Sequence, residues 1–408
     1  MKKITKLLAV VLCFALIAAF AACAGKTNNE STAPDASDGA STPDATVNIG
    51  DFDFTKTGEF TAENTKFVLG ATGPLTGDAS SYGISVQKGA TLAVEEINAK
   101  GGVNGKEIEF VMLDDEADAT KAGNAYDQLF EQGMQISLGS VTSGSCEQFA
   151  SRTAEDGVFA ITPSASAANV IAASDTMFRI CFGDPDQGVL AAEELTKNYS
   201  NIGAIYDNSD PYSSGIYDAF KAKMAELGTE YTEQTFDKEN NKDFSTQVEA
   251  LKDCDVIFMP IYYTQAGLIA KACQAKGVNA VLYGCDGFDG IKGQLEGADV
   301  SNKIMYITPF DAAAEDEKTK AFVDAFGGKY DGEIPDQFAA DAYDAVYVLA
   351  TAMEQIGVDN VTVAPDAIGE ALVATLTSSS FQYTGVTGGM TWDSTGACTK
   401  VPVVVELN

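Results

Sequence analysis

Residues 70–106 read GATGPLTGDASSYGISVQKGATLAVEEINAKGGVNGK, and this stretch decides the fold. The apolar run at 67–71 stops at glycines and a proline, which predicts a buried strand that ends in a loop. After Gly83, small and aliphatic residues recur on one helical stripe, and the pair at 101–102 ends that helix. A strand, a glycine-rich loop and a helix place backbone amides where a small anion can bind. The same pattern also fits an ordinary strand–helix unit, so the rest of the chain must decide.

The body of the chain, residues 65–408, continues this alternation in two series. The first series has expected strands at 108–113, 135–139 and 158–162, with helices at 119–131 and up to residue 156. The second series starts near residue 184, and its expected strands cover 202–206, 256–259, 280–283 and 304–308. This order predicts parallel sheets covered by helices on both faces. The body is too long for one small core, which favours two α/β lobes.

The amino terminus has the pattern of a secretion signal. Residues 1–22 contain three early lysines and then an apolar run that is too short for a membrane span. Small residues before Cys23 resemble a bacterial lipobox, which would make Cys23 the lipidated first residue of the mature protein. Plain secretion with cleavage near Ala22 is the alternative. We expect residues 23–64 to form a lipid anchor and a disordered polar tether, which would hold the body at the outer face of the bacterial cell membrane.

Composition excludes several classes of function. The chain has 59 acidic and 26 basic residues and a formal charge of −33, which argues against nucleic-acid binding. It has no histidine, which removes Ser-His-Asp and Cys-His catalysis and the commonest zinc ligand. The cysteines after Cys23 form no CxxC pair, so we expect buried thiols, with one or two disulfides as the alternative. GxSxG, GxGxxG and P-loop motifs are absent as well. We therefore expect no enzyme, no metal site and no cofactor.

The block at 70–106 resembles the first strand, ligand loop and first helix of the branched-chain amino acid binding proteins that serve ABC importers. That resemblance implies the type I periplasmic binding fold, in which two doubly wound parallel-sheet lobes are joined by three crossover segments. We place the crossovers near residues 183, 309 and 385. The amino-terminal lobe is then 65–183 plus 309–385, and the carboxyl-terminal lobe is 184–308 plus 386–408.

The resemblance also implies a function. A member of this family would bind a small amino acid, branched-chain or otherwise neutral, and deliver it to the membrane subunits of an ABC permease. We expect such a protein to be a monomer. An extracellular sensor of amino acids or amides with the same fold is the alternative.

Two loops match the family's carboxylate-binding segments. In 139–145, Ser143 is the best match for the serine that binds the ligand carboxylate, with Val141 and Thr142 beside it. A serine there could instead cap the following helix. In 162–166, Ser166 stands where the family commonly has a threonine, Ala165 precedes it, and the carbonyl of Ser164 could accept from the ligand ammonium group.

The remaining candidates are one acidic residue and a set of aromatic residues. Asp286 matches the acidic residue that pairs with the ligand ammonium group, and Asp289 is a second candidate. The aromatic candidates around the ligand are Tyr82, Tyr212, Tyr262 or Tyr263, and Phe338. The sequence leaves the choice between the two adjacent tyrosines open, and Phe338 could equally be a core residue. These loop tips carry no lysine or arginine, which favours a ligand with a neutral side chain.

Overall fold

The computed structural model describes residues 52–407, so the predicted signal peptide and Cys23 lie outside the described residues. The first lobe contains a five-stranded parallel sheet in the order β2-β1-β3-β4-β5. Its strands are β1 (Phe67–Gly73), β2 (Ile108–Asp114), β3 (Ile136–Ser137), β4 (Phe159–Thr162) and β5 (Met177–Arg179). Every residue of β1 is buried, as expected for a central strand with helices on both faces.

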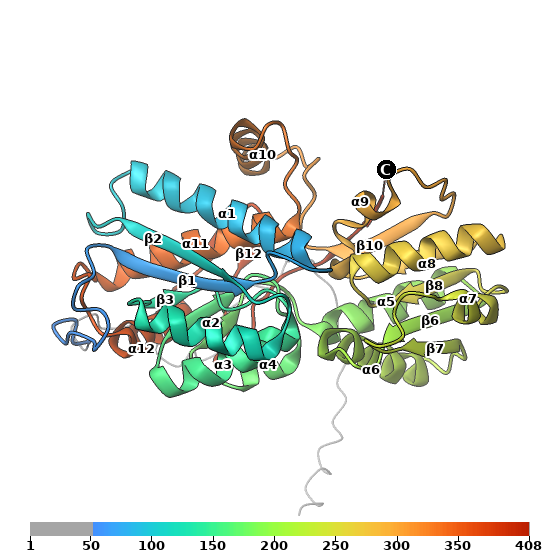
Figure 1. The fold of residues 1–408 in the computed structure, drawn as a ribbon, viewed down its shortest axis with the longest axis horizontal. Helices are drawn as coiled ribbons and strands as arrows, with labels where there is room; N and C mark the ends of the chain where they lie inside the picture. Colours follow the sequence, from blue (N-terminus) through green and yellow to red (C-terminus); the bar gives the residue numbers. More distant parts are fainter. Residues whose placement is uncertain (1–51, 408) are drawn as a thin grey trace, which may run out of the picture. The chain divides into compact units, whose positions relative to one another are not determined.

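Helices cover both faces of the first sheet (Figure 1). One face carries α1 (Ser80–Ala99), α11 (Gln337–Ile356) and α12 (Pro365–Leu376). The other face carries α2 (Ala119–Glu131), α3 (Ser143–Asp156) and α4 (Ala168–Ala172). Helix α10 (Glu317–Lys329) packs its phenylalanines against Leu92 of α1 and the start of α11.

The second lobe contains a six-stranded sheet in the order β13-β10-β9-β8-β6-β7. Its strands are β6 (Ile202–Asp207), β7 (Thr232–Phe236), β8 (Val256–Met259), β9 (Val281–Gly284), β10 (Ile304–Thr308) and β13 (Val403–Glu406). All pairs are parallel except β10 with β13, which is antiparallel. Helices α5 (Asp184–Asn198) and α6 (Pro211–Glu226) cover one face. Helices α7 (Ser245–Ala250), α8 (Tyr263–Lys276) and α9 (Ile291–Leu295) cover the other.

This architecture confirms the predicted fold class of two doubly wound α/β lobes. Several elements agree closely with the predicted ranges, among them α2, β8 and β10. The strands β5 and β7 and the helices α10 and α12 had no counterpart in the prediction. Strand β7 is largely exposed at the sheet edge, so its residues lack the apolar run that revealed the buried strands.

Residues 52–64 differ from the predicted tether because they pack against the first lobe. Thr57 forms a β-bridge with Val363, and the hydroxyl of Thr61 donates to the carbonyl of Thr362 over 2.6 Å. Asn64 donates to the carbonyl of Gly133 over 2.9 Å. These contacts hold residues 52–64 against the first lobe, so the ordered body begins earlier than residue 65.

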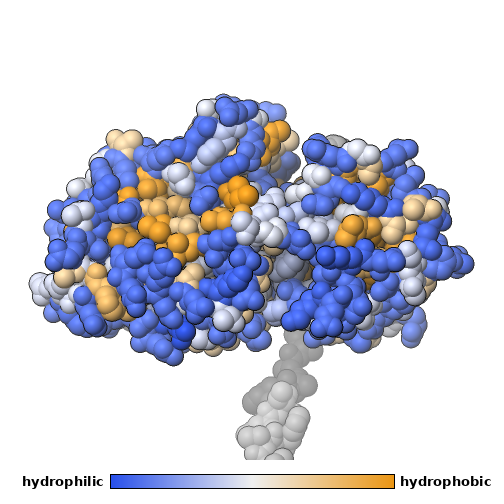
Figure 2. Space-filling view, viewed as in Figure 1, coloured by the Kyte–Doolittle hydropathy of each residue, from blue (hydrophilic) through white to orange (hydrophobic). Residues whose placement is uncertain are grey.

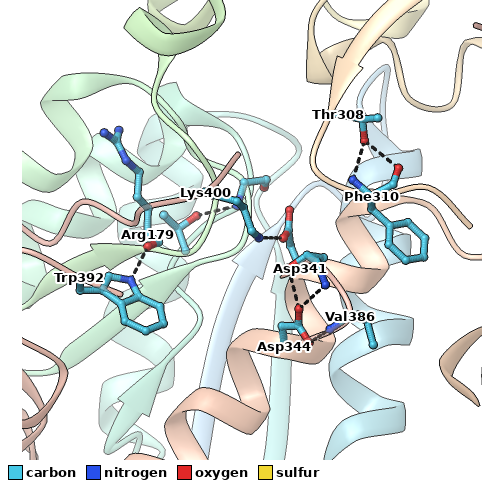
Figure 3. A network of polar contacts seen from close by, with 11 residues as sticks. Arg179, Thr308, Phe310, Asp341, Asp344, Val386, Trp392 and Lys400 are labelled. Atoms are coloured by element: carbon cyan, nitrogen blue, oxygen red, sulfur yellow. Dashed lines mark hydrogen bonds and ion pairs between the residues drawn. The ribbon is translucent and has the colours of Figure 1, made fainter. Parts of the chain in front are cut away.

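The third crossover also differs from its expected place near residue 385. After the hairpin of β11 (Tyr383–Gly385) and β12 (Gly388–Met390), Trp392 donates its indole N–H to the carbonyl of Arg179 over 2.8 Å (Figure 3). Lys400 then forms a buried ion pair with Asp341 of α11, before β13 joins the second sheet. Residues 386–400 therefore belong to the first lobe, because their apolar side chains and Lys400 find their partners there.

One face of the described part of the protein is predominantly polar. Figure 2 shows hydrophilic side chains over much of the viewed face, with apolar side chains gathered in separate groups. Among residues 52–407, we find no helix with the length and apolar character needed to cross a membrane.

Candidate functional site

The carboxyl ends of strands from both sheets meet around a small cavity that is lined mostly by buried side chains. Loops after β3, β4, β8 and β9 contribute to its wall, together with the first turns of α1, α6 and α11. Its lining residues are Tyr82, Val141, Thr142, Ser143, Ser164, Tyr212, Tyr262, Asp286, Gly287 and Phe338. The lining side chains leave little free space between them, so the site suits a small molecule.

Asp286 supplies the carboxylate in the cavity wall. Its Oδ1 accepts hydrogen bonds from the Tyr212 hydroxyl at 2.6 Å, from Gln187 Nε2 at 3.0 Å and from the Gly287 amide at 2.9 Å. Within the described part of the chain, its Oδ2 accepts no hydrogen bond. Burial raises the pKa of Asp286, and the bonds from Tyr212 and Gln187 lower it again in part. The side chain is thus held rigidly, with one oxygen available to a cation.

Contacts between the two lobes close the cavity. The hydroxyl of Tyr82 from α1 donates to the carbonyl of Gly287 and accepts from the amide of Tyr263 at 3.1 Å. Gln337, at the start of α11, donates its Nε2 to the carbonyl of Asp286 over 2.6 Å and its amide to Asp289 over 3.0 Å. These bonds join groups from opposite lobes, so they exist only when the lobes are closed on the cavity.

The first turn of α3 faces the cavity from the first lobe. Thr142 is the N-cap residue of α3, but no side chain caps this helix, so the capping role considered for the loop serines is not observed. The Ser143 hydroxyl accepts from the amide of Ala167 at 3.2 Å, and the Ser164 hydroxyl donates to the carbonyl of Val141 over 2.8 Å. An uncapped helix start, with amides that lack intrahelical partners, attracts a small anion.

Aromatic rings form much of the apolar wall. Tyr82 packs on Phe338 with 4.3 Å between ring centroids, and its ring meets Tyr262 edge-on at 5.6 Å. Tyr262 in turn stacks on Tyr212 at 4.9 Å and 13°. Phe338 also belongs to the apolar core between α1 and α11, so the wall and core roles considered for it occur together.

The structure brings nine of the twelve predicted site residues to the cavity wall. The other three, Ala165, Ser166 and Tyr263, do not line it. The carbonyl of Ser166 accepts from Arg179 Nη1 at 2.7 Å and from the Asp184 amide at 3.1 Å. Tyr262 precedes α8 and Tyr263 opens it, so their side chains diverge: Tyr262 lines the cavity and the Tyr263 hydroxyl accepts from the Ser81 amide at 3.3 Å.

Three residues of the site were missed in the sequence. Gly287 lines the cavity, and a β-carbon there would lie 2.7 Å from the Tyr212 hydroxyl. The glycine directly after Asp286 was a signal for this close approach. Gln187 and Gln337 orient Asp286 from α5 and α11, and nothing in their local sequence reveals contacts over 99 and 51 positions.

A larger hollow of about 680 Å³ lies elsewhere on the first lobe, between α1, α10, α11 and the β11–β12 hairpin. Its polar groups already have partners: Glu96 accepts from the hydroxyls of Tyr343 and Tyr347, and Lys100 donates to Tyr347 over 3.1 Å. It lies away from the strand ends and is open to solvent. We therefore place the functional site at the smaller, enclosed cavity.

The described residues hold no cluster of metal-binding side chains and no disulfide. Among residues 52–407, no group of three or more histidine, cysteine, aspartate or glutamate side chains could hold a metal ion. The six cysteines in this range are free thiols, and burial raises the pKa of Cys146 and Cys273 to about 12. Thiols of this kind are poor nucleophiles at neutral pH.

We expect the ligand-free protein to become more stable as the pH falls from 7.5 to 5. Burial raises the pKa of Asp210 to about 7, above the usual value of 3.8. The folded protein thus binds protons that the unfolded chain has released, and this stabilisation is lost as the pH rises through 7. The expected gain at pH 5 is roughly 1–3 kcal/mol in the free energy of urea unfolding.

Asp210→Asn is the control for this pH dependence. Asp210 caps α6 by accepting from the Ser213 amide at 3.0 Å, and asparagine caps equally well without titrating. The variant should show a weaker pH dependence than the wild type. A wild-type stability that stays constant or rises between pH 5 and 7.5 would contradict the expectation.

A family model described as "Periplasmic binding protein" matches residues 66–403 of the chain. The Leu/Ile/Val-binding protein BraC3 of Rhizobium johnstonii is 31% identical over 337 residues, which cover 81% of this chain and 89% of BraC3. The leucine-, isoleucine-, valine-, threonine- and alanine-binding protein of Pseudomonas aeruginosa is 29% identical over 307 residues, which cover 74% and 80% of the two chains.

A solved structure of a branched-chain amino acid binding protein is also similar to this chain. The branched-chain amino acid transporter substrate-binding protein LivJ of Streptococcus pneumoniae, in complex with isoleucine, aligns with a TM-score of 0.75 at 29% identity. The alignment covers 84% of this chain and 96% of LivJ.

Proposed function

Because the chain belongs to the branched-chain amino acid substrate-binding family of ABC transporters, with the type I periplasmic binding fold, we propose that it captures a small neutral amino acid in the enclosed cavity. The observation that carries this proposal is the free Oδ2 of Asp286 opposite the uncapped first turn of α3. A carboxylate on one side and helix amides on the other match the two charges of an α-amino acid.

Each part of the ligand has a partner in the cavity wall. The ammonium group binds Asp286 Oδ2, and the carboxylate binds the Ser143 hydroxyl and the amides that open α3. The ligand side chain lies against Val141, Phe338 and the tyrosine rings, which are apolar on their faces. A second negative charge on the ligand would find no lysine or arginine in the lining, so neutral amino acids are favoured over acidic ones.

The proposed work of the protein is capture followed by delivery. The lobes open and close about the three crossovers, and closure removes the ligand from water and assembles the face that a permease recognises. Lipidation of Cys23 would keep the protein at the outer face of the cell membrane, and the protein would act as a monomer. No observation in the site or in the relatives favours the sensor role considered from the sequence.

The test is thermal unfolding of the purified protein against the twenty amino acids, after bound ligand has been removed by unfolding and refolding. A ligand at a hundred times its Kd should add about 2.7 kcal/mol of stability, which raises the unfolding midpoint. We expect the shift with neutral amino acids and not with aspartate or glutamate. The absence of a shift with every amino acid, in protein that has regained its fold, would overturn the proposal.

A further inference from the structure

Two hydroxyl groups in the cavity wall lack hydrogen-bond partners. Thr142 Oγ1 and Tyr262 Oη are both buried, and neither contacts a polar partner within residues 52–407. The other hydroxyls of the lining have partners, which are Gly287 for Tyr82, Asp286 for Tyr212, Val141 for Ser164 and Ala167 for Ser143. A buried hydroxyl without a hydrogen-bond partner is unfavourable, so we expect a polar group of the ligand to bind these two hydroxyls inside the cavity.

Both hydroxyls are held in place by their surroundings. The Tyr262 ring is fixed between Tyr212, on which it stacks, and the edge of Tyr82. Burial raises the pKa of Tyr262, so its hydroxyl keeps the proton and can donate. Thr142 projects from the N-cap position of α3, has 6% of its surface exposed and makes no capping bond. Since neither hydroxyl can move far, a ligand group that forms a hydrogen bond with them must lie within reach of their present positions.

The two charges of the ligand already have other partners under the proposed function. Asp286 Oδ2 binds the ammonium group, and Ser143 with the first turn of α3 binds the carboxylate. Thr142 and Tyr262 are then left for the ligand side chain. The lining side chains leave little free space, so the ligand side chain must be short. Among the described lining residues Asp286 is the one that carries a charge, so a charged ligand side chain would stay unpaired.

We propose, on the basis of the proposed function, that the preferred ligand is a small amino acid with a hydroxyl group on its side chain, bound by Thr142 and Tyr262. Threonine and valine differ only by a hydroxyl in place of a methyl group, so they separate this inference from binding by shape alone. A site built to bond a ligand hydroxyl rejects the hydrocarbon analogue far more strongly than an apolar site rejects an added hydroxyl.

The experiment is calorimetric titration of the ligand-free full chain with threonine, valine, serine and alanine. Wild-type protein should bind threonine at least about tenfold more tightly than valine. Thr142→Val and Tyr262→Phe should each reduce this ratio, and should do so by weakening threonine while valine binding is kept. Ser145→Ala is the matched control, because the Ser145 hydroxyl is also buried on α3 without a partner but does not line the cavity.

The outcomes separate this inference from the proposed function. Valine binding as tight as threonine binding in the wild type would overturn the inference and leave the binding role standing. An equal loss of threonine and valine in either variant would also overturn it, since that hydroxyl would then serve the carboxylate or ammonium group that all amino acids share. Folded protein that binds none of the four, nor any other amino acid, would overturn both.

Discussion

Asp286→Asn is expected to raise the Kd for the amino acid ligand by roughly 30-fold to several thousand-fold. The asparagine retains the shape of the side chain but removes the negative charge that meets the ligand ammonium group. Losing one partner of a buried, hydrogen-bonded charge pair costs about 2–5 kcal/mol, since the other charge stays buried and unpaired. Direct titration calorimetry of wild type and variant measures the effect.

Without ligand, Asp286→Asn should raise the free energy of unfolding or leave it unchanged. Burial raises the pKa of Asp286, so its charge is unfavourable to the empty closed protein, and the amide relieves that cost. Asp255→Asn is a suitable control, because Asp255 lies before β8, at the opposite end of that strand from the cavity, and accepts from the amide of Asn201 at 2.9 Å. Equal binding by Asp286→Asn and Asp255→Asn would show that Asp286 does not contact the ligand.

The cavity wall was largely predictable because its residues follow buried strands. Val141, Thr142 and Ser143 come after an apolar run, and a parallel sheet brings such strand ends to one edge. The choice between Tyr262 and Tyr263 was not predictable, since it depends on where α8 begins, and helix boundaries shift by one residue without a change in the apolar pattern.

The positions of the connections between the lobes were harder to predict from the sequence. The segment before β13 has the turn residues and short apolar runs of closing strands, which fits either lobe. Its place is decided by Trp392 and Lys400, whose partners Arg179 and Asp341 lie 213 and 59 positions away. Contacts over such separations depend on the tertiary structure, and no local spacing indicates them.

Lys400→Met is expected to destabilise the protein by about 3–5 kcal/mol at neutral pH. The side chains of Lys400 and Asp341 are only 1% and 3% exposed, so the methionine would leave a buried carboxylate without its cation (Figure 3). Asp344 lies in the same region, where it accepts from the amides of Val386 and Thr387 at 2.9 Å, and its charge adds to the cost. Urea unfolding of wild type and variant measures the difference.

Two further variants make this prediction specific to the buried pair at the third crossover. Lys303→Met removes the exposed ion pair with Glu406 of β13, whose side chains are 45% and 52% exposed, and should cost at most about 1 kcal/mol. Adding Asp341→Leu to Lys400→Met should recover much of the loss, because a buried pair replaced on both sides by apolar residues is often neutral. Since Asp341 can take up a proton once its cation is gone, the cost of Lys400→Met should also be smaller at pH 5 than at pH 8.

A cost of Lys400→Met no larger than that of Lys303→Met would mean that water reaches Lys400, and that apolar packing around Trp392 alone fixes the third crossover to the first lobe.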